Sequence, residues 1–231
     1  MIGIAVGSGL SDEILREFTP TVVEVDGRKV ELYFGHLAGV RVCLLPRHGV
    51  RVPVGPHLID HAANLKAMAE YEVTTVVGIS STGSLRREYR VPSIMIPEDY
   101  IDLHGSTVHT GPVHIVPELS GRVREALIKA ARELKVRPLY TRGVYFQTRG
   151  PRLETKAEIA MISQFADVVG MTMGSEATVA MELGMEYASI CTVDNYAHGV
   201  GKGLSPEAIK DAARTNTATA IRIVEKAIPE L

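Results

Sequence analysis

Four short polar segments, each following an apolar run, have the residue types that bind an oxyanion. They are residues 7–9 (Gly-Ser-Gly), 47–49 (Arg-His-Gly), 80–84 (Ser-Ser-Thr-Gly-Ser) and 170–172 (Gly-Met-Thr). Their hydroxyls, guanidinium, imidazole and free backbone N–H groups are the donors that an anion needs. Because all four follow strand-like runs, we expect these loops to hold a phosphate-sized anion at one edge of a sheet.

These segments fit other phosphate-binding and hydrolase motifs poorly. The dinucleotide-binding fingerprint would need a third glycine after residues 7–9, where this chain has Asp12, and no Walker A sequence occurs. A tight strand-to-helix turn is the simpler alternative for that segment. A serine-hydrolase elbow requires Gly-x-Ser-x-Gly, but Thr82 occupies the last position of the motif. The hydroxyls of residues 80–84 are therefore interpreted as donors rather than as an activated nucleophile.

The composition limits the class of protein. The chain has 231 residues, of which 45% are hydrophobic and 23% charged, and its formal net charge is -2. With no linker-like segment, residues 1–231 are predicted to form a single α/β domain. No basic run indicates a nucleic-acid surface, and no apolar stretch approaches the roughly 20 residues that span a membrane. The start of the chain lacks a basic leader, so we expect a cytoplasmic protein, with Cys43 and Cys191 buried as free thiols.

Apolar periodicity predicts the elements that must position these segments. Strands are expected at residues 2–6, 21–25, 30–34, 40–45, 73–79, 93–96, 136–147, 167–169 and 187–193. Helices are expected at residues 11–18, 57–71, 117–134, 154–164, 175–183 and 205–228. Hairpin-like strands followed by alternating strands and helices predict a mixed sheet flanked by helices.

Three histidines, His104, His109 and His114, lie five residues apart in a loop rich in glycine and threonine. Metal binding is one interpretation of this spacing, but no cysteine or acidic cluster completes a site. A flexible loop that covers a pocket is the more economical interpretation, and we expect no metal.

The ordered set of motifs resembles the trimeric purine nucleoside phosphorylases and methylthioadenosine phosphorylases, over residues 1–228. The matching segments are residues 7–10, 47–49, Asn64, 82–85, 150–152 with 157–158, 170–172 with Glu176, and 187–189. The resemblance implies a nucleoside phosphorylase-like α/β fold, in which a mixed twisted sheet is partly closed into a barrel and flanked by helices. His61 is a departure, since a tyrosine is common there.

The resemblance also implies a site and an assembly. The implied phosphate-binding residues are Ser8, Arg47, His48, Ser80, Ser81 and Thr172. Met171 would lie against the ribose, and His114 would reach into the pocket of an adjacent subunit of a homotrimer or a dimer of trimers. Phosphate is a co-substrate of this family, so no cofactor is expected.

The chemistry of phosphorolysis agrees with this set of residues. An anionic nucleophile must be fixed below the anomeric carbon, where it also compensates the developing oxocarbenium charge. The departing purine gathers negative charge and needs a donor or a proton at N7. The first two requirements account for the anion-binding segments, and the third requires a residue at the base.

Two residues indicate which purine leaves. The resemblance implies that adenine-specific relatives carry aspartates where this chain has Asn195 and Ala197. The carboxamide of Asn195 can donate to N7 while its oxygen accepts from N1–H, or its NH₂ group can donate to a 6-oxo group. Phosphorylases of 6-oxopurines similarly have a glutamate at the position of Glu154, which would accept a hydrogen bond from N1–H. The alternatives are a charge in the first turn of a helix for Glu154 and a turn residue for Asn195.

The start of the last predicted helix indicates which 5′ substituent of the sugar the protein binds. Residues 204–209 lack the histidine with which relatives bind a 5′-hydroxyl, which favours a methylthio group. Asn195 with Tyr196, Ala197 and Gly199 resembles the methylthioinosine phosphorylase variant, with Tyr196 and Ala197 among the implied substrate-binding residues.

We therefore expect phosphorolysis of methylthioinosine, inosine or guanosine to the free purine and a sugar 1-phosphate, as in purine salvage. The catalytic residues would be Asn195, Glu154 and His48. Open alternatives are a methylthioadenosine phosphorylase, a nucleoside hydrolase that uses water, and a non-catalytic nucleoside-binding protein.

Overall fold

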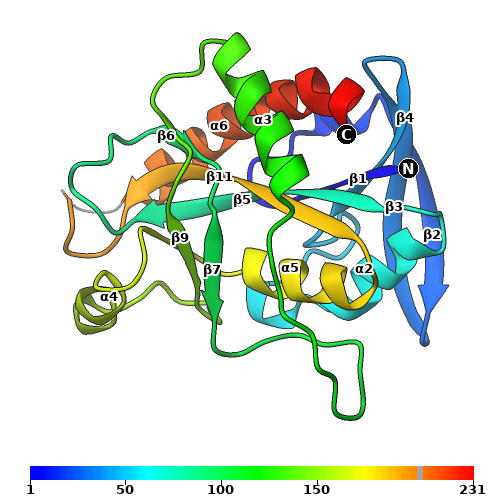
Figure 1. Cartoon of the computed structure of the whole chain (residues 1–231), viewed down its shortest axis with the longest axis horizontal. Coiled ribbons are helices and arrows are strands. Elements are labelled where there is room, and N and C mark those ends of the chain that lie inside the picture. The colour runs from blue at the N-terminus through cyan, green and yellow to red at the C-terminus, as the bar shows by residue number, and fades with distance from the viewer. Residues whose placement is uncertain (202–204) are drawn as a thin grey trace.

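The computed structural model describes residues 1–201 and 205–231 and contains one eleven-stranded mixed sheet with helices on both faces (Figure 1). The strands are β1 (Ile2–Val6), β2 (Thr19–Val25), β3 (Arg28–Leu37), β4 (Val40–Pro46), β5 (Thr75–Ser84), β6 (Ser93–Met95), β7 (Asp99–Asp102), β8 (Leu139–Tyr140), β9 (Val144–Gln147), β10 (Val168–Gly170) and β11 (Glu186–Tyr196). The helices are α1 (Asp12–Leu15), α2 (His61–Ala69), α3 (Gly121–Glu133), α4 (Lys156–Ile162), α5 (Met173–Glu182) and α6 (Pro206–Ala227), with 3-10 turns η1 (Pro56–Leu58) and η2 (Ile228–Glu230).

The sheet branches at the long strand β5. The strand order is β2-β3-β4-β1-β5-β10-β9-β7, while β11 pairs with both β5 and β6, and β6 also pairs with β8. β5 is parallel to β1 and β11 and antiparallel to β10 at its carboxyl end. The mixed α/β sheet predicted from the sequence is confirmed. Its pairing forms an open path, and the branch at β5 is compatible with partial closure into a barrel.

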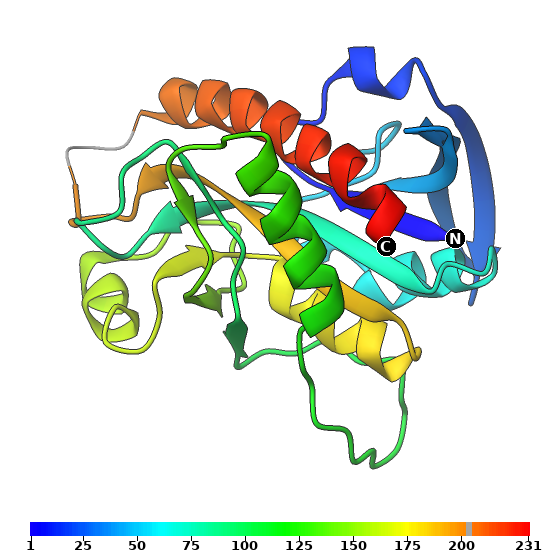
Figure 2. The same cartoon turned by 45° about the horizontal axis from the view of Figure 1, so that its top comes forward.

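Alternation of side chains along the central strands builds one core on each face of the sheet. Ile2, Ile4 and Val6 of β1 belong to the core shared with α3 and α6, which lie together over one face (Figure 2). Ala5 instead belongs to the core that includes buried residues of α2 and α5 on the opposite face. Cys43 and Cys191 are buried and free, as expected. Within the two described ranges, no helix is long and apolar enough to cross a membrane.

Several element boundaries differ from the sequence predictions. β5 continues as a strand through Ser84, so residues 80–84 are not a loop. The helix predicted at 11–18 is a single turn, and that at 57–71 is divided into η1 and α2 because Asp60 caps α2 by accepting the Ala63 N–H. The run 136–147 forms two short strands, β8 and β9, and β7 was not predicted.

The parallel strands bring distant segments of the sequence to one edge of the sheet. β1 is parallel to β4 and β5, and β5 is parallel to β11, so their carboxyl ends point the same way. Residues 7–9 follow β1, residues 47–49 follow β4, and the last residues of β5 and β11 lie at the same edge. A binding site at the carboxyl ends of such strands is the general arrangement of open α/β sheets.

Candidate active site

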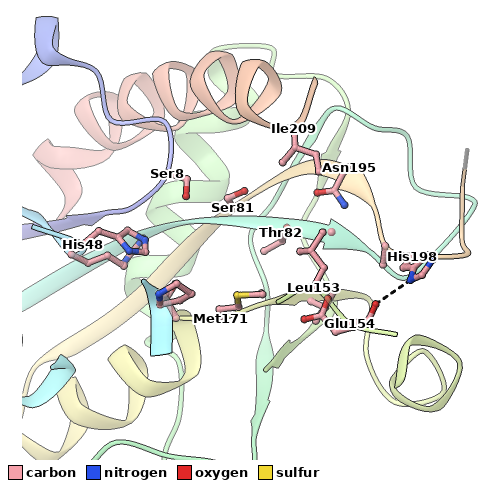
Figure 3. A pocket seen from close by; sticks show the side chains of 17 residues that line it. Ser8, His48, Ser81, Thr82, Leu153, Glu154, Met171, Asn195, His198 and Ile209 are labelled. Atoms are coloured by element: carbon pink, nitrogen blue, oxygen red, sulfur yellow. Dashed lines mark hydrogen bonds between the residues drawn. The ribbon is translucent and has the colours of Figure 1, made fainter. Parts of the chain in front are cut away.

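A cavity of about 200 Å³ lies at this edge and contains residues from all four polar segments (Figure 3). The residues proposed from the sequence that line it are Ser8, Arg47, His48, Ser81, Glu154, Met171, Thr172, Asn195 and Ala197. They come from segments up to 189 residues apart in sequence, since Ser8 and Ala197 lie at the two ends of that range. The structure therefore joins the anion-binding candidates and the base-reading candidates in one cavity.

Three residues proposed from the sequence lie outside this wall. The prediction that Ser80 binds phosphate is corrected by its place in the structure. Because β5 continues through residues 80–84, the Ser80 hydroxyl is buried, and Thr82 lines the cavity instead. Tyr196 borders a separate surface depression together with Arg87. His114 is exposed, and residues 103–120 contribute nothing to the described wall of this chain's own cavity. The start of the loop instead lines two neighbouring depressions, where His104 lies among residues that include Glu154 and Met171, and the expectation that the loop covers a pocket stays a prediction.

Arg47 is buried and held by four hydrogen bonds. Its Nε donates to Glu176 Oε1 over 2.5 Å, and Nη2 donates to Glu176 Oε2 over 3.1 Å. Nη2 and Nη1 also donate to the carbonyls of Ala5 and Ile79, each over 2.7 Å. Burial acts to lower the pKa of Arg47, but the Glu176 carboxylate more than offsets it and the pKa is raised. The arginine is therefore a fixed cation whose charge is paired inside the protein.

The guanidinium has one N–H left for a ligand, since a guanidinium carries five N–H donors and four are engaged. The free donor is on Nη1, which lies under the loop that follows β1. A Cβ at Gly7 would come within 2.4 Å of this nitrogen, so the close approach requires glycine. Arg47 thus offers a single directed hydrogen bond rather than the two-pronged grip expected of a free arginine.

His48 is fixed in one orientation by the backbone. Its Nδ1 lies 2.9 Å from the carbonyl oxygen of Val54, which can only accept, so Nδ1 carries the proton. Nε2 then faces the loop after β1, where a Cβ at Gly7 would lie 3.4 Å away. Burial and, next, the charge of Arg47 lower the pKa of His48. With the proton on Nδ1, the neutral form of the ring, which this shift favours, presents a lone pair at Nε2.

A buried carboxylate, Asp194, stands behind the cavity wall. Its Oδ2 accepts hydrogen bonds from Ser81 Oγ over 2.6 Å and from Thr192 Oγ1 over 2.8 Å. Its Oδ1 accepts from Asn216 Nδ2 of α6 over 2.8 Å. Burial raises the pKa of Asp194, and the three donors oppose that shift. The residue lies where the pairing of β11 with β5 shifts register between Val193 and Asn195.

Glu154 is available to a ligand because the adjacent helix is capped by other residues. Thr155 and Glu158 form a capping box at the start of α4, which places Glu154 just outside the helix. Its side chain is buried, and Oε1 accepts a hydrogen bond from Thr148 Oγ1 over 2.5 Å. The alternative role of a charge in the first helical turn is therefore excluded.

Asn195 faces the same end of the cavity from the last part of β11. Its Nδ2 donates to the carbonyl of Tyr196 over 2.8 Å. This bond leaves the second N–H and Oδ1 of the amide for a ligand. A Cβ at Gly83 would lie 3.1 Å from Nδ2, so the glycine gives the amide its room. The residue is part of a strand, and the alternative of a simple turn residue does not apply.

The segment after β10 closes the middle of the cavity. Thr172 precedes α5, and its backbone N–H donates to Tyr145 Oη over 3.0 Å, while its side chain makes no capping bond to the helix. The hydroxyl therefore stays available beside the amino end of a ten-residue helix, where anions are stabilised. Met171 lies close to Gly150, whose Cβ would come within 2.6 Å of the methionine sulfur.

Sequence reasoning missed several residues of the site. His198 lines the cavity and its Nδ1 lies 3.2 Å from the carbonyl oxygen of Glu154, and Ile209 of α6 adds an apolar wall. Asp194 had a signal in the sequence, because this acidic residue directly follows the uncharged run 187–193 and precedes Asn195. Ile209 had none, since its approach to the cavity depends on the tertiary placement of α6.

Comparison with known proteins agrees with the geometry. The model of the family described as the phosphorylase superfamily matches residues 1–229. A probable 6-oxopurine nucleoside phosphorylase of Archaeoglobus fulgidus is 45% identical, covering 100% of this chain and 97% of the relative. A probable S-methyl-5′-thioinosine phosphorylase of Methanocaldococcus jannaschii is 35% identical, covering 88% and 82%. The crystal structure of a methylthioadenosine phosphorylase from an antarctic soil metagenomic library superposes with a TM-score of 0.86 at 25% identity, covering 99% and 85%.

Proposed function

This chain belongs to the phosphorylase superfamily and is a pentosyltransferase, and we propose that it cleaves 6-oxopurine nucleosides with inorganic phosphate. The products are the free purine and a ribose or methylthioribose 1-phosphate, the reaction of purine salvage. The reaction joins a phosphate oxygen to C1′ of the sugar and breaks the bond from C1′ to the purine nitrogen. No protein nucleophile and no cofactor take part.

The observation that carries this proposal is the presence of Glu154 and Asn195 in the cavity that also holds the anion-binding groups. A hypoxanthine or guanine base has a proton at N1 and an oxygen at C6. The Glu154 carboxylate accepts a hydrogen bond from N1–H, and the amide of Asn195 donates a hydrogen bond to O6 or N7. An adenine base has no N1 proton, so binding it leaves the buried Glu154 carboxylate without that partner.

The phosphate occupies the opposite end of the cavity. The hydroxyls of Ser8 and Thr172 and the free N–H of Arg47 donate to it, with His48 beside them. The bound anion supplies both the nucleophile and the negative charge that stabilises the oxocarbenium-like sugar. Met171 lies between the two ends and packs against the ribose.

The 5′ end of the sugar is assigned to the wall that includes Ile209. An isoleucine favours an apolar 5′ substituent over a hydroxyl, which supports S-methyl-5′-thioinosine as a substrate alongside inosine and guanosine. Leu204, which the sequence argument also used, lies outside the described residues.

We also propose that the enzyme is a cytoplasmic homotrimer or dimer of trimers, with residues 1–231 acting as one domain. His114 lies in an exposed segment together with Val113 and Val116, which are 40% and 77% exposed. Exposed valines beside a histidine suit a segment that packs on a second copy and reaches its cavity.

Phosphate dependence tests the reaction type. We expect purine release from inosine to require phosphate and to yield one sugar 1-phosphate for each purine. Arg47→Ala should weaken the use of phosphate more than the binding of nucleoside. Equal turnover without phosphate would instead show a hydrolase, and binding of intact nucleoside and phosphate without turnover would show a binding protein.

A further inference from the structure

The anion end of the cavity carries little net positive charge. Arg47 is the one lysine or arginine among the described residues that line the cavity, and Glu176, which is itself fully buried, accepts hydrogen bonds from two nitrogens of its guanidinium. Such a closely paired and buried couple contributes a dipole rather than a full positive charge to its surroundings. This arrangement fits a singly charged anion better than a doubly charged one.

The hydroxyl of Ser81 does not donate its proton into the cavity. A serine has one O–H, and the proton of Ser81 is directed to Asp194, 2.6 Å away. Asp194 is held by two further donors, Thr192 and Asn216, so its position behind the wall is fixed from β11 and α6. Ser81 Oγ therefore presents only lone pairs to the cavity that it lines.

His48 is an acceptor at the same end for a different reason. Its Nδ1 proton is committed to the carbonyl of Val54, and Nε2 faces the loop that carries Ser8. Two hydrogen-bond acceptors thus lie where the proposed function places an anion. The dianion HPO₄²⁻ carries only one proton, so binding it would leave one of these acceptors facing an unprotonated oxygen.

Resting on the proposed function, we infer that the enzyme binds phosphate as the monoanion H₂PO₄⁻ and that Ser81 Oγ and His48 Nε2 accept its two hydroxyl protons. The two unprotonated oxygens receive the donors, which are the hydroxyls of Ser8 and Thr172 and the free N–H of Arg47. Asp194 is a positioning residue in this arrangement, because it fixes the polarity of Ser81 without touching the ligand.

The reaction balances with this form of phosphate. As the oxygen of H₂PO₄⁻ bonds to C1′, the bond from C1′ to the purine nitrogen breaks and its electron pair leaves with the base. The phosphate ester then loses one of its two protons to water and the departing purine takes one proton from water, so the products are the neutral purine and the monoanion of the sugar 1-phosphate. No other co-reactant is needed.

The charged and titratable groups around this end come from five elements. They are Arg47 and His48 after β4, Glu176 on α5, Asp194 and Tyr187 on β11, His61 on α2, and Tyr145 on β9. Burial lowers the pKa of His61 to about 4 and raises the pKa of Tyr187 well above its usual value. Neither changes charge between pH 6 and pH 8.5. Burial and the charge of Arg47 lower the pKa of His48 from 6.5, so any charge on its ring is lost at the acid end of this range, and the change in affinity above pH 7 follows the ionisation of phosphate.

The test is the affinity of the intact enzyme for inorganic phosphate from pH 6 to pH 8.5, measured by titration calorimetry without nucleoside. The dissociation constant for total phosphate should be lowest at pH 6 and should rise toward tenfold per pH unit as the monoanion is depleted. A constant affinity, or one that improves with pH, would overturn the inference while leaving phosphorolysis intact. Phosphate-independent purine release would instead contradict the proposed function.

Two variants separate the role of Ser81 from general stability. Ser81→Ala removes one acceptor and should weaken binding about tenfold at pH 6, with a smaller effect at pH 8.5. Asp194→Asn replaces an oxygen with an N–H that donates to Ser81 and frees the serine proton for the cavity, so the pH dependence should flatten. Asp211→Asn, exposed on α6, is the matched control. A Ser81→Ala enzyme that keeps the native affinity and pH profile would refute the arrangement even if Asp194→Asn failed to fold.

Discussion

The guanidinium of Arg47 and the carboxylate of Glu176 form a two-pronged pair inside the protein, with Nε 2.5 Å from Oε1 and Nη2 3.1 Å from Oε2. Tyr187 Oη donates to the same carboxylate over 2.9 Å. Gly78 leaves room for the tyrosine hydroxyl, because a Cβ at residue 78 would lie 2.1 Å from Tyr187 Oη. The pair orients the one N–H that remains for phosphate. An arginine that is fixed before the substrate arrives avoids the entropy loss of ordering it on binding.

Removing Glu176 should expose the cost of an unpaired buried cation. Glu176→Ala is expected to lower the free energy of unfolding by about 3–5 kcal/mol, because Arg47 stays buried without its partner. Urea denaturation measures the loss. The control is Glu186→Gln, which disrupts the exposed pair with Arg122 and should cost less than about 1 kcal/mol. Similar losses in the two variants would contradict the assigned role.

The base specificity should move with the two residues at the purine end. Glu154→Gln is expected to lower kcat/KM for inosine about tenfold, since a charged acceptor for N1–H is lost, with little change for adenosine. Asn195→Asp should shift the preference toward 6-aminopurine nucleosides. Steady-state kinetics on both substrates measures the ratio, and Glu225→Gln on the exposed face of α6 serves as control. An unchanged ratio in both variants would refute the base assignment.

Ile209 should decide between 5′ substituents. Replacing it with histidine introduces a polar group at the cavity wall, so we expect the ratio of kcat/KM for methylthioinosine to that for inosine to fall about tenfold. Ala218→His places the same side chain at an exposed position of the same helix and should leave the ratio unchanged. A ratio that does not respond to Ile209→His would place the 5′ end elsewhere.

Acid should destabilise the fold through His61. Burial lowers its pKa to about 4 from 6.5, so the unfolded chain takes up a proton first as the pH falls. The associated stability is present above pH 6.5 and is lost between pH 6.5 and about pH 4, which amounts to about 2 kcal/mol between pH 7 and pH 5. Urea unfolding of His61→Gln should show a smaller pH dependence than the native protein. Exposed His36→Gln should not, and identical behaviour of the two variants would contradict the argument.

The sequence predicted the order and type of most elements because their apolar patterns are local. It also identified nine of the residues that line the cavity. Six of them lie in the polar segments that follow strand-like runs, whereas Glu154, Asn195 and Ala197 were identified from the resemblance to the phosphorylase family. The lengths of β5 and β11 were underestimated, because polar residues such as Ser80 and Thr82 read as loop. These residues remain in a strand since pairing with β11 supplies their backbone partners.

The fate of side-chain donors could not be read from the sequence. Arg47 was expected to donate to a phosphate, but Glu176, 129 residues away, accepts two of its hydrogen bonds. Ser81 was interpreted as a donor, but Asp194, 113 residues away, takes its proton. Both hydrogen-bonding arrangements depend on tertiary contacts. The residue type shows which hydrogen bonds a side chain can make, but only the folded structure shows which partners take them.

A competition assay tests the central claim most directly. The purified enzyme would be given phosphate with equal concentrations of inosine, adenosine and their 5′-methylthio analogues, and the released bases would be quantified. The account predicts that hypoxanthine is released at least about tenfold faster than adenine, because only a 6-oxopurine satisfies Glu154 and Asn195 together. Preferential release of adenine from methylthioadenosine would contradict it.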